Sequence, residues 1–245
     1  MAEGHSPLEQ FSIHRLVPLE LGGYDVSITN SALFMGIVVL LATAFMVMAA
    51  SPRALVPGRL QAAGELAYEF IASLVKENAG SAGMKYFPVI FTIFIFILFS
   101  NLIGLVPYTF TVTSHIAVTF ALAFTLFVGI TLIGIFKHGA KFITMFLPSG
   151  VPLWISPLLF VIELLSYMTR PISLSVRLFA NMMAGHIMLK VFAMFVVSLG
   201  VLGGWAPLAF IVTLTGLELL VAVLQAYVFT ILTCIYLNDA LHLHH

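Results

Sequence analysis

The sequence predicts an all-α integral membrane protein, with about five membrane helices plus one amphipathic helix at the membrane interface. Composition is the first reason: 61% of the 245 residues are hydrophobic and 8% are charged, against about 25% charged residues in soluble domains. The second reason is that several uncharged runs reach the ~20 residues that a helix needs to cross a bilayer. The formal net charge is zero, which gives no indication of a nucleic-acid partner. We therefore treat residues 1–245 as a single integral membrane domain.

The first third of the chain contains a polar arm, a span and an amphipathic segment. Residues 1–29 are mixed and polar, and they predict an exposed N-terminal arm. Residues 31–50 hold no charge and predict the first span, which ends just before Arg53 and Arg59. Residues 60–78 combine apolar and polar side chains at helical spacing. They predict an amphipathic helix that lies along the membrane or against other spans.

The next two predicted spans set the orientation of the chain. Residues 87–106 and 116–136 are long enough and apolar enough to cross the membrane. Lys137 and His138 follow the second of these spans at once. Basic residues gather in cytoplasmic loops, so the basic ends of the first and third spans are expected in the cytoplasm. The N-terminus is then outside and the C-terminus is cytoplasmic.

The last hundred residues predict a hairpin of two long helices. Residues 152–198 and 207–241 are apolar runs separated by a glycine-rich turn. The first run could hold roughly 40 helical residues, or about 55–60 Å at 1.5 Å per residue. A hydrocarbon core is only ~30 Å thick, and an ordinary tilt of ~20° does not absorb the excess. We infer an antiparallel, strongly tilted hairpin, although length alone also fits normal spans with extra surface helix at each end.

Arg177 lies in the middle of the first long run, and an arginine at membrane depth costs at least ~2.5–3.5 kcal/mol. Its guanidinium cannot lose a proton to escape that cost, so it must face water, an anion or both. Residues at three- and four-residue spacing share its face of the helix. Polar and small residues on that face are typical of a surface that meets protein or water. This stripe consists of Arg170, Ser173, Arg177, Asn181, Ala184 and Met188.

Polar residues of the second long run match those of the first in height if the helices are antiparallel. Equal or nearly equal sums of residue numbers give three levels, good to about one turn: Glu163 with Asp239, Arg177 with Gln225, and His186 with Glu218. Histidine and carboxylate groups titrate and can relay protons, whereas a fixed arginine charge repels a proton that crosses directly. The pattern predicts a proton path divided by a barrier. The missing counter-ion of Arg177 is best supplied by a carboxylate of another chain.

Four stretches of this sequence resemble the a subunit of rotary F-type ATP synthases. They are residues 6–11, 101–107, 163–186 and 218–229, of which the arginine motif in 177–186 is the most specific. The resemblance covers nearly the whole chain. It implies a proton-conducting stator beside a ring of c subunits, in which two offset half-channels load and unload the ring carboxylates. The family's essential arginine falls on Arg177, where it would block direct proton leak.

The resemblance also implies a set of proton-pathway residues, which falls here on Glu163, Asn181, His186, Glu218, Gln225 and Asp239. Some bacterial members carry an acidic residue at the position of His186 and a histidine at that of Glu218. This chain has the arrangement of mitochondrial and some related bacterial forms. The implied partners are the c ring, b-type peripheral stalk subunits, the remainder of the F1Fo complex and the lipid bilayer. No cofactor, metal or nucleic acid is implied, and the chain is not expected to be an enzyme by itself.

A histidine in the path favours H⁺ over Na⁺ as the coupling ion. A bacterial plasma membrane is the expected location, with the mitochondrial inner membrane as the alternative.

Several other interpretations remain open from the sequence alone. A secondary transporter could bind substrate at mid-membrane charges, although we find no internal repeat. An intramembrane enzyme is disfavoured, because the known hydrolase and nucleotide-binding motifs are absent. The polar residues also have ordinary structural roles open to them: packing for His186, interhelical hydrogen bonding for Asn181 and Gln225, and headgroup contact for Glu163 and Asp239. Asn101 and His115 are weaker candidates for an outer vestibule.

Overall fold

The computed structural model describes residues 11–18, 20–21, 24–25, 27–51, 57–106, 109–139, 141–142 and 155–242. The main helices of this part are α1 (Asn30–Ala50), α2 (Arg59–Gly83), α3 (Phe87–Gly104), α4 (Ile116–His138), α5 (Ser156–Gly203) and α6 (Trp205–Leu241). Five helical stretches, with α2 and α3 joined as one, are long and apolar enough to cross a membrane. The predicted fold class, an all-α membrane protein, is confirmed.

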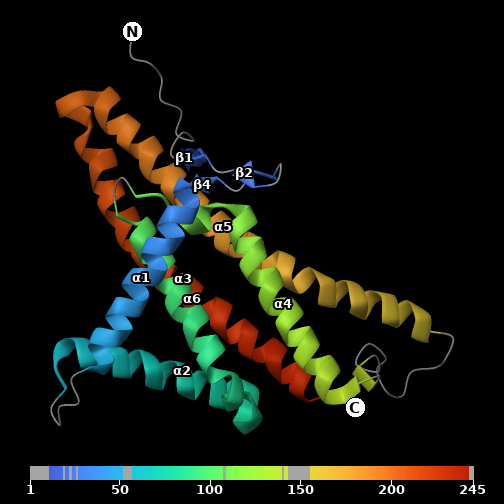
Figure 1. Ribbon diagram of the computed structural model, residues 1–245. Coiled ribbons are helices and arrows are strands. Elements are labelled where there is room, and N and C mark those ends of the chain that lie inside the picture. Colours follow the sequence, from blue (N-terminus) through green and yellow to red (C-terminus); the bar gives the residue numbers. More distant parts are fainter. Residues whose placement is uncertain are drawn as a thin grey trace.

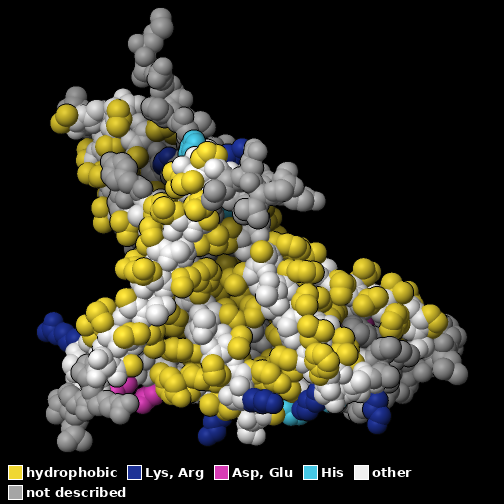
Figure 2. Space-filling model, viewed as in Figure 1, with side chains coloured by type: hydrophobic (Ala, Val, Ile, Leu, Met, Phe, Trp, Pro, Cys, Tyr) yellow, Lys and Arg dark blue, Asp and Glu magenta, His cyan; other side chains and the backbone are white. Residues whose placement is uncertain are grey.

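The surface of the molecule agrees with this fold class. In Figure 2, apolar side chains cover a broad middle zone, and Lys and Arg side chains gather along the edge formed by α2 and the C-terminal ends of α4 and α6. Apolar side chains on the outside are expected where the solvent is lipid, because lipid tails are as apolar as leucine.

A short β arm precedes the helices. Its two antiparallel pairs are β1 (Arg15–Val17) with β4 (Ile28–Thr29), and β2 (Glu20–Leu21) with β3 (Tyr24–Asp25). Asn30 joins this arm to the start of α1. Its Oδ1 accepts a hydrogen bond from the His14 amide at 3.2 Å, and its Nδ2 donates to the Ser12 carbonyl at 3.0 Å.

α2 lies across the ends of the neighbouring helices (Figure 1) and leads into α3 through the short 3₁₀ helix η2 (Met84–Tyr86). The break between them is at Gly80, whose φ of 67° is a left-handed conformation that glycine adopts without steric cost. Gly64 allows α2 to approach α1 closely, because a Cβ at this position would lie 2.7 Å from the Cβ of Ala49.

The apolar core lies where α2, α3 and α4 pack against α6 and the adjoining part of α5. Its most buried members come from all of these helices and include Ile71, Val75, Ile97, Ala123, Leu178, Phe229 and Leu237. Lys137 fastens the C-terminal ends of α4 and α6, since its Nζ donates to the Leu241 carbonyl at 2.8 Å. A cation is favourable there, because the last carbonyls of a helix lack partners within the helix.

α5 and α6 form an antiparallel hairpin, as predicted. Gly200, with φ of 60°, breaks the last turn of α5, and the rings of Phe192 and Phe210 stack across the hairpin at 5.3 Å. Away from the turn the two helices diverge, and α4 packs against both (Figure 1). The predicted start of the first long run, 152–154, lies outside the described residues; the helix begins at Ser156.

Candidate functional site

The polar residues of the hairpin fall into three groups along its length. The first lies at the turn end, which is the end near Gly204. His186 of α5 is half-buried there, and its Nε2 lies 3.0 Å from Oγ1 of Thr111. Thr111 itself is buried, in the segment between α3 and α4, and immediately precedes the 3₁₀ helix η3 (Val112–Ser114). The ring of Phe11 lies 6.5 Å from the His186 ring.

Glu218 of α6 lies against the residue before His186. Gly185 has no side chain, and a Cβ built there would overlap the Glu218 carboxylate. Both carboxylate oxygens of Glu218 are shielded from solvent and have no hydrogen-bond partner among the described residues. The predicted level of His186 with Glu218 is therefore confirmed to within one residue. A buried carboxylate without a protein partner is a costly arrangement, which marks the position for a function other than packing.

Asn101 ties the turn end together. Its side chain is fully buried, its Nδ2 donates to the Ala222 carbonyl of α6 at 3.1 Å, and its Oδ1 accepts from Thr113 Oγ1 at 2.9 Å. His115 follows two residues later, with its ring stacked on Phe110 at 4.8 Å. Burial lowers the pKa of His115 below its usual value, which favours the neutral imidazole. Asn101 is bonded to Thr113, and His115 lies four residues after Thr111, which contacts His186; their role in a vestibule stays a prediction.

The middle group contains Arg177. Gln225 of α6 is buried, and its Oε1 accepts a hydrogen bond from Asn181 Nδ2 at 2.9 Å. Gln225 thus pairs with Asn181, one turn from Arg177, which is within the one-turn precision of the expected level. Arg177 is exposed and makes no hydrogen bond or ion pair with the part of the chain that the structure describes.

Apart from Arg170, which turns toward α6, the Arg177 stripe lies on the exposed side of α5. Ser173, Arg177, Asn181 and Ala184 are exposed. The opposite face of α5 is buried: Leu174 is 4%, Leu178 0% and Met182 4% exposed. The essential feature of the site is thus a permanent cation on an outward-facing surface within an apolar helix.

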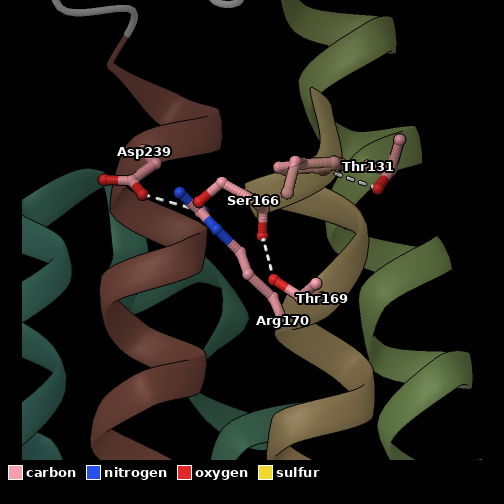
Figure 3. Close-up of polar contacts among 6 residues, drawn as sticks. Thr131, Ser166, Thr169, Arg170 and Asp239 are labelled. Carbon is pink, nitrogen blue, oxygen red and sulfur yellow. Dashed lines mark hydrogen bonds and ion pairs between the residues drawn. The ribbon is translucent and has the colours of Figure 1, made fainter. Parts of the chain in front are cut away.

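The third group lies at the far end of the hairpin from the turn. Arg170 Nη1 lies 3.0 Å from Asp239 Oδ2, and its side chain crosses from α5 to α6 (Figure 3). The guanidinium carbon also lies 5.2 Å and 4.8 Å from the ring centres of Tyr167 and Tyr236. Glu163 is half-buried and has no ion pair or hydrogen bond with any described residue.

The expected level of Glu163 with Asp239 is therefore wrong by about two turns, because Asp239 pairs with Arg170. Gly185 is fifteen positions after Arg170 in α5, whereas Asp239 is twenty-one positions after Glu218 in α6. Equal sums of residue numbers indicate equal height only where the two helix axes are parallel, but α5 and α6 diverge away from the turn (Figure 1). The long Arg170 side chain spans the resulting gap.

The described residues hold no group of three or more His, Cys, Asp or Glu side chains that could bind a metal ion. Titratable groups lie at both ends of the hairpin, and a fixed positive charge lies between them. Such an arrangement can bind and release protons.

The family model described as "ATP synthase A chain" matches residues 32–238. This chain belongs to that family. The match includes α1 to α6 almost completely, and with them the three groups of polar residues described above except Asp239, which lies one residue beyond the matched range.

Individual relatives agree over their full length. The chain is 57% identical over 240 residues to ATP synthase subunit a of Rhodospirillum rubrum, covering 98% of this chain and 100% of the relative. It is 55% identical to the Pelagibacter ubique protein of the same name, over 98% and 99% of the two chains. For Mesorhizobium japonicum the identity is 56%, over 100% of this chain and 99% of the relative. The resemblance proposed from the sequence motifs is confirmed.

Sequence reasoning missed several residues that shape the site. Thr111 and Gly185 contact the predicted site residues His186 and Glu218, and Tyr167 and Tyr236 flank Arg170, the ion-pair partner of Asp239. A signal was present for Thr111, because Thr111, Thr113, Ser114 and His115 form a polar cluster next to a predicted span. For the two tyrosines no such signal exists, since aromatic residues at membrane interfaces are common.

Proposed function

We propose that this chain is the proton-conducting stator subunit of a rotary F-type ATP synthase, in which Arg177 faces a ring of c subunits. The observation that carries the proposal is the exposure of Arg177 without an anion among the described residues. A permanent cation on a lipid-facing surface would cost at least ~2.5–3.5 kcal/mol. A carboxylate on a neighbouring chain removes that cost and explains why the polar stripe points outward.

Two offset half-channels account for the other polar groups. His186, Glu218, Asn101 and His115 form the access route at the turn end, and they exchange protons between the outside and the ring carboxylate. Glu163 and the region around Asp239 form the route at the opposite end, toward the cytoplasm. Arg177 lies between the two routes and repels a proton that would pass directly, so a proton must travel with the ring.

Asn181 and Gln225 complete the site beside Arg177. Their hydrogen bond fixes both amides next to the stripe, while Gln225 Nε2 is buried with no acceptor among the described residues. We infer that these amides orient the ring carboxylate or its water as it passes. A hydrogen bond to a charged group is worth about 1.5–3 kcal/mol, which is strong enough to position a carboxylate and weak enough to release it.

The proposed topology follows from the basic residues. The edge with Lys137, His138 and the C-terminus faces the cytoplasm, and the N-terminal arm of residues 1–29 faces outside. α5 has 48 residues, or about 70 Å at 1.5 Å per residue, which supports a strong tilt of the hairpin across a ~30 Å core. All of 1–245 then acts as one membrane domain in a bacterial plasma membrane.

Other subunits complete the proposed assembly. A b-type peripheral stalk holds the subunit still against the ring, and the remainder of the F1Fo complex carries out ATP synthesis. The chain moves protons and catalyses no bond change by itself.

Replacing Arg177 tests the proposal. Arg177→Ala is expected to abolish ATP-driven proton pumping and ATP synthesis in membrane vesicles while the subunit still assembles, and passive proton leak is expected to persist. Arg177→Lys should largely fail, because an ammonium lacks the planar fork and can lose its proton. Arg59→Ala, which removes an exposed arginine at the start of α2, is the matched control and should keep pumping. Normal coupled synthesis in Arg177→Ala would overturn the proposal.

A further inference from the structure

Thr111 is held against the end of α3 with little freedom to move. It is 6% exposed, and its side chain lies directly on the Cα of Gly104: a Cβ at Gly104 would lie 2.6 Å from Thr111 Cγ2 and 3.0 Å from its Oγ1. The absence of a side chain at Gly104 therefore decides where the Thr111 hydroxyl lies. From that position Oγ1 contacts two groups, the Gly104 carbonyl at 3.2 Å and His186 Nε2 at 3.0 Å.

A hydroxyl has one hydrogen to donate and two lone pairs to accept with. Gly104 is the last residue of α3, so its carbonyl is among those that a helix leaves without an internal donor. Among the described residues, the Thr111 hydroxyl is the donor to the Gly104 carbonyl. If the hydroxyl hydrogen goes to Gly104, the hydroxyl oxygen must accept from His186, and Nε2 must carry a hydrogen.

The protonated state of His186 requires the same direction for this hydrogen bond. Imidazolium carries hydrogens on both ring nitrogens, so Nε2 is then a donor and Thr111 must accept from it. If the hydroxyl donated to neutral Nε2, its O–H bond would have to rotate away from the ring each time the ring gained a proton. A hydroxyl that donates to Gly104 keeps both of its hydrogen bonds in the two charge states of the ring.

We propose that Thr111 is a positioning residue that fixes the Nε2–H tautomer of His186, so that the proton relay runs through Nδ1 alone. The proposal rests on the proposed function, because it assigns an atom to a step of that proton path. An incoming proton bonds to the Nδ1 lone pair and yields imidazolium. On release the same Nδ1–H bond breaks and its electron pair stays on Nδ1, while Nε2–H remains bound to Thr111 throughout.

Glu218 is the group that we expect to exchange this proton with Nδ1. Its carboxylate lies against Gly185, the neighbour of His186, and its oxygens have no partner among the described residues. With Nε2 held on the α3 side by Thr111, the ring presents a single acceptor to the rest of the path. A fixed tautomer thus gives the relay one entry and exit atom, as second-shell partners do for other functional histidines.

The test is the ¹⁵N spectrum of His186 in the intact complex, reconstituted in lipid bilayers with labelled histidine. The His186 signals are assigned by their loss in His186→Gln. At a pH where the ring is neutral, we expect a protonated Nε2 and an unprotonated Nδ1 in the unmodified protein. Thr111→Val, which keeps the shape and removes the hydroxyl, should reduce the preference for this tautomer by about tenfold, the worth of one hydrogen bond. Thr111→Ser should restore it.

Thr113→Val is the matched control, since Thr113 is a neighbouring buried threonine whose hydroxyl donates to Asn101 instead. It should leave the His186 spectrum unchanged. A protonated Nδ1 in the unmodified protein, or an unchanged spectrum in Thr111→Val, would overturn the proposal. The spectrum of the unmodified protein shows which nitrogen of His186 is protonated even if Thr111→Val does not assemble.

This readout is separate from transport. Coupled synthesis in Arg177→Ala would refute the stator function and leave the tautomer result standing. The opposite tautomer would refute the role of Thr111 and leave the stator function standing.

Discussion

The guanidinium of Arg170 lies 3.0 Å from the carboxylate of Asp239 and joins the two long helices at the end of the hairpin where they diverge. Two tyrosine rings flank the same guanidinium within 5.2 Å, and one of them, Tyr167, is fixed to α4 through a 2.7 Å hydrogen bond between its hydroxyl and Thr131. Figure 3 shows Thr131 on the side of α5 away from Asp239. α4, α5 and α6 are thus linked around the Arg170 guanidinium.

Removing either charge of this pair should loosen the hairpin. The side chains are only 19% and 28% exposed, so Arg170→Gln or Asp239→Asn leaves a partly buried charge without its partner. A double-mutant cycle on the thermal stability of the purified complex should give a coupling energy of about 1.5–3 kcal/mol, the range for charged hydrogen bonds. Arg170→Lys should recover only part of this, because it loses the planar contact with the tyrosine rings. Additive effects of the two single variants would show that the pair does not stabilise the hairpin.

Gly185 should be required for its small size. Gly185→Ala places a methyl group where the Glu218 carboxylate lies, so that carboxylate must move. A displacement of ~1 Å can cost up to ~100-fold in a rate, and we expect passive proton flow through Fo in vesicles to fall by roughly tenfold or more. Gly216→Ala is the control: it lies in α6 two residues from Glu218, and its Cβ would meet no atom within 4 Å. Equal proton flow in the two variants would show that the Glu218 position is not critical.

His186 and Glu218 should act as a coupled pair. Replacing either with an apolar residue should slow proton flow. The exchange of both, His186→Glu with Glu218→His, should recover more proton pumping than the product of the two single effects, because residues in one network are not additive. ATP-driven acidification of vesicles measures this. Strictly multiplicative losses would mean that the two groups work independently.

Much of the fold was predictable from the sequence, because a membrane helix is decided by composition and length. The uncharged runs predicted the helices that became α1, α3 and α4, and the excess length of the last two runs predicted the hairpin. The outward direction of the Arg177 stripe also followed from helical spacing, since Leu174 and Leu178 lie on the opposite face and are buried.

The pairing of residues across the hairpin was predictable only near the turn. Sums of residue numbers placed His186 near Glu218 correctly, because this level is about half as far from Gly200 along each helix as Arg170 and Asp239 are. The same rule failed for Asp239, where the divergence of α5 and α6 has accumulated over the length of both helices. Thr111 could not be assigned to His186 at all, because that contact depends on where a loop between two other helices folds back.

The measurement that tests the account most directly is disulfide crosslinking between this chain and a c subunit. Single cysteines at Ser173 and Ala184 represent the exposed Arg177 stripe, and cysteines at Leu174 and Met182 represent the buried face of α5. Buried Cys234 is replaced by alanine in all variants, and the partner cysteine lies one turn from the ring carboxylate. The account predicts that oxidation crosslinks the first two positions and not the second two. Equal crosslinking from both faces, or none from Ser173 and Ala184, would contradict a ring that passes Arg177.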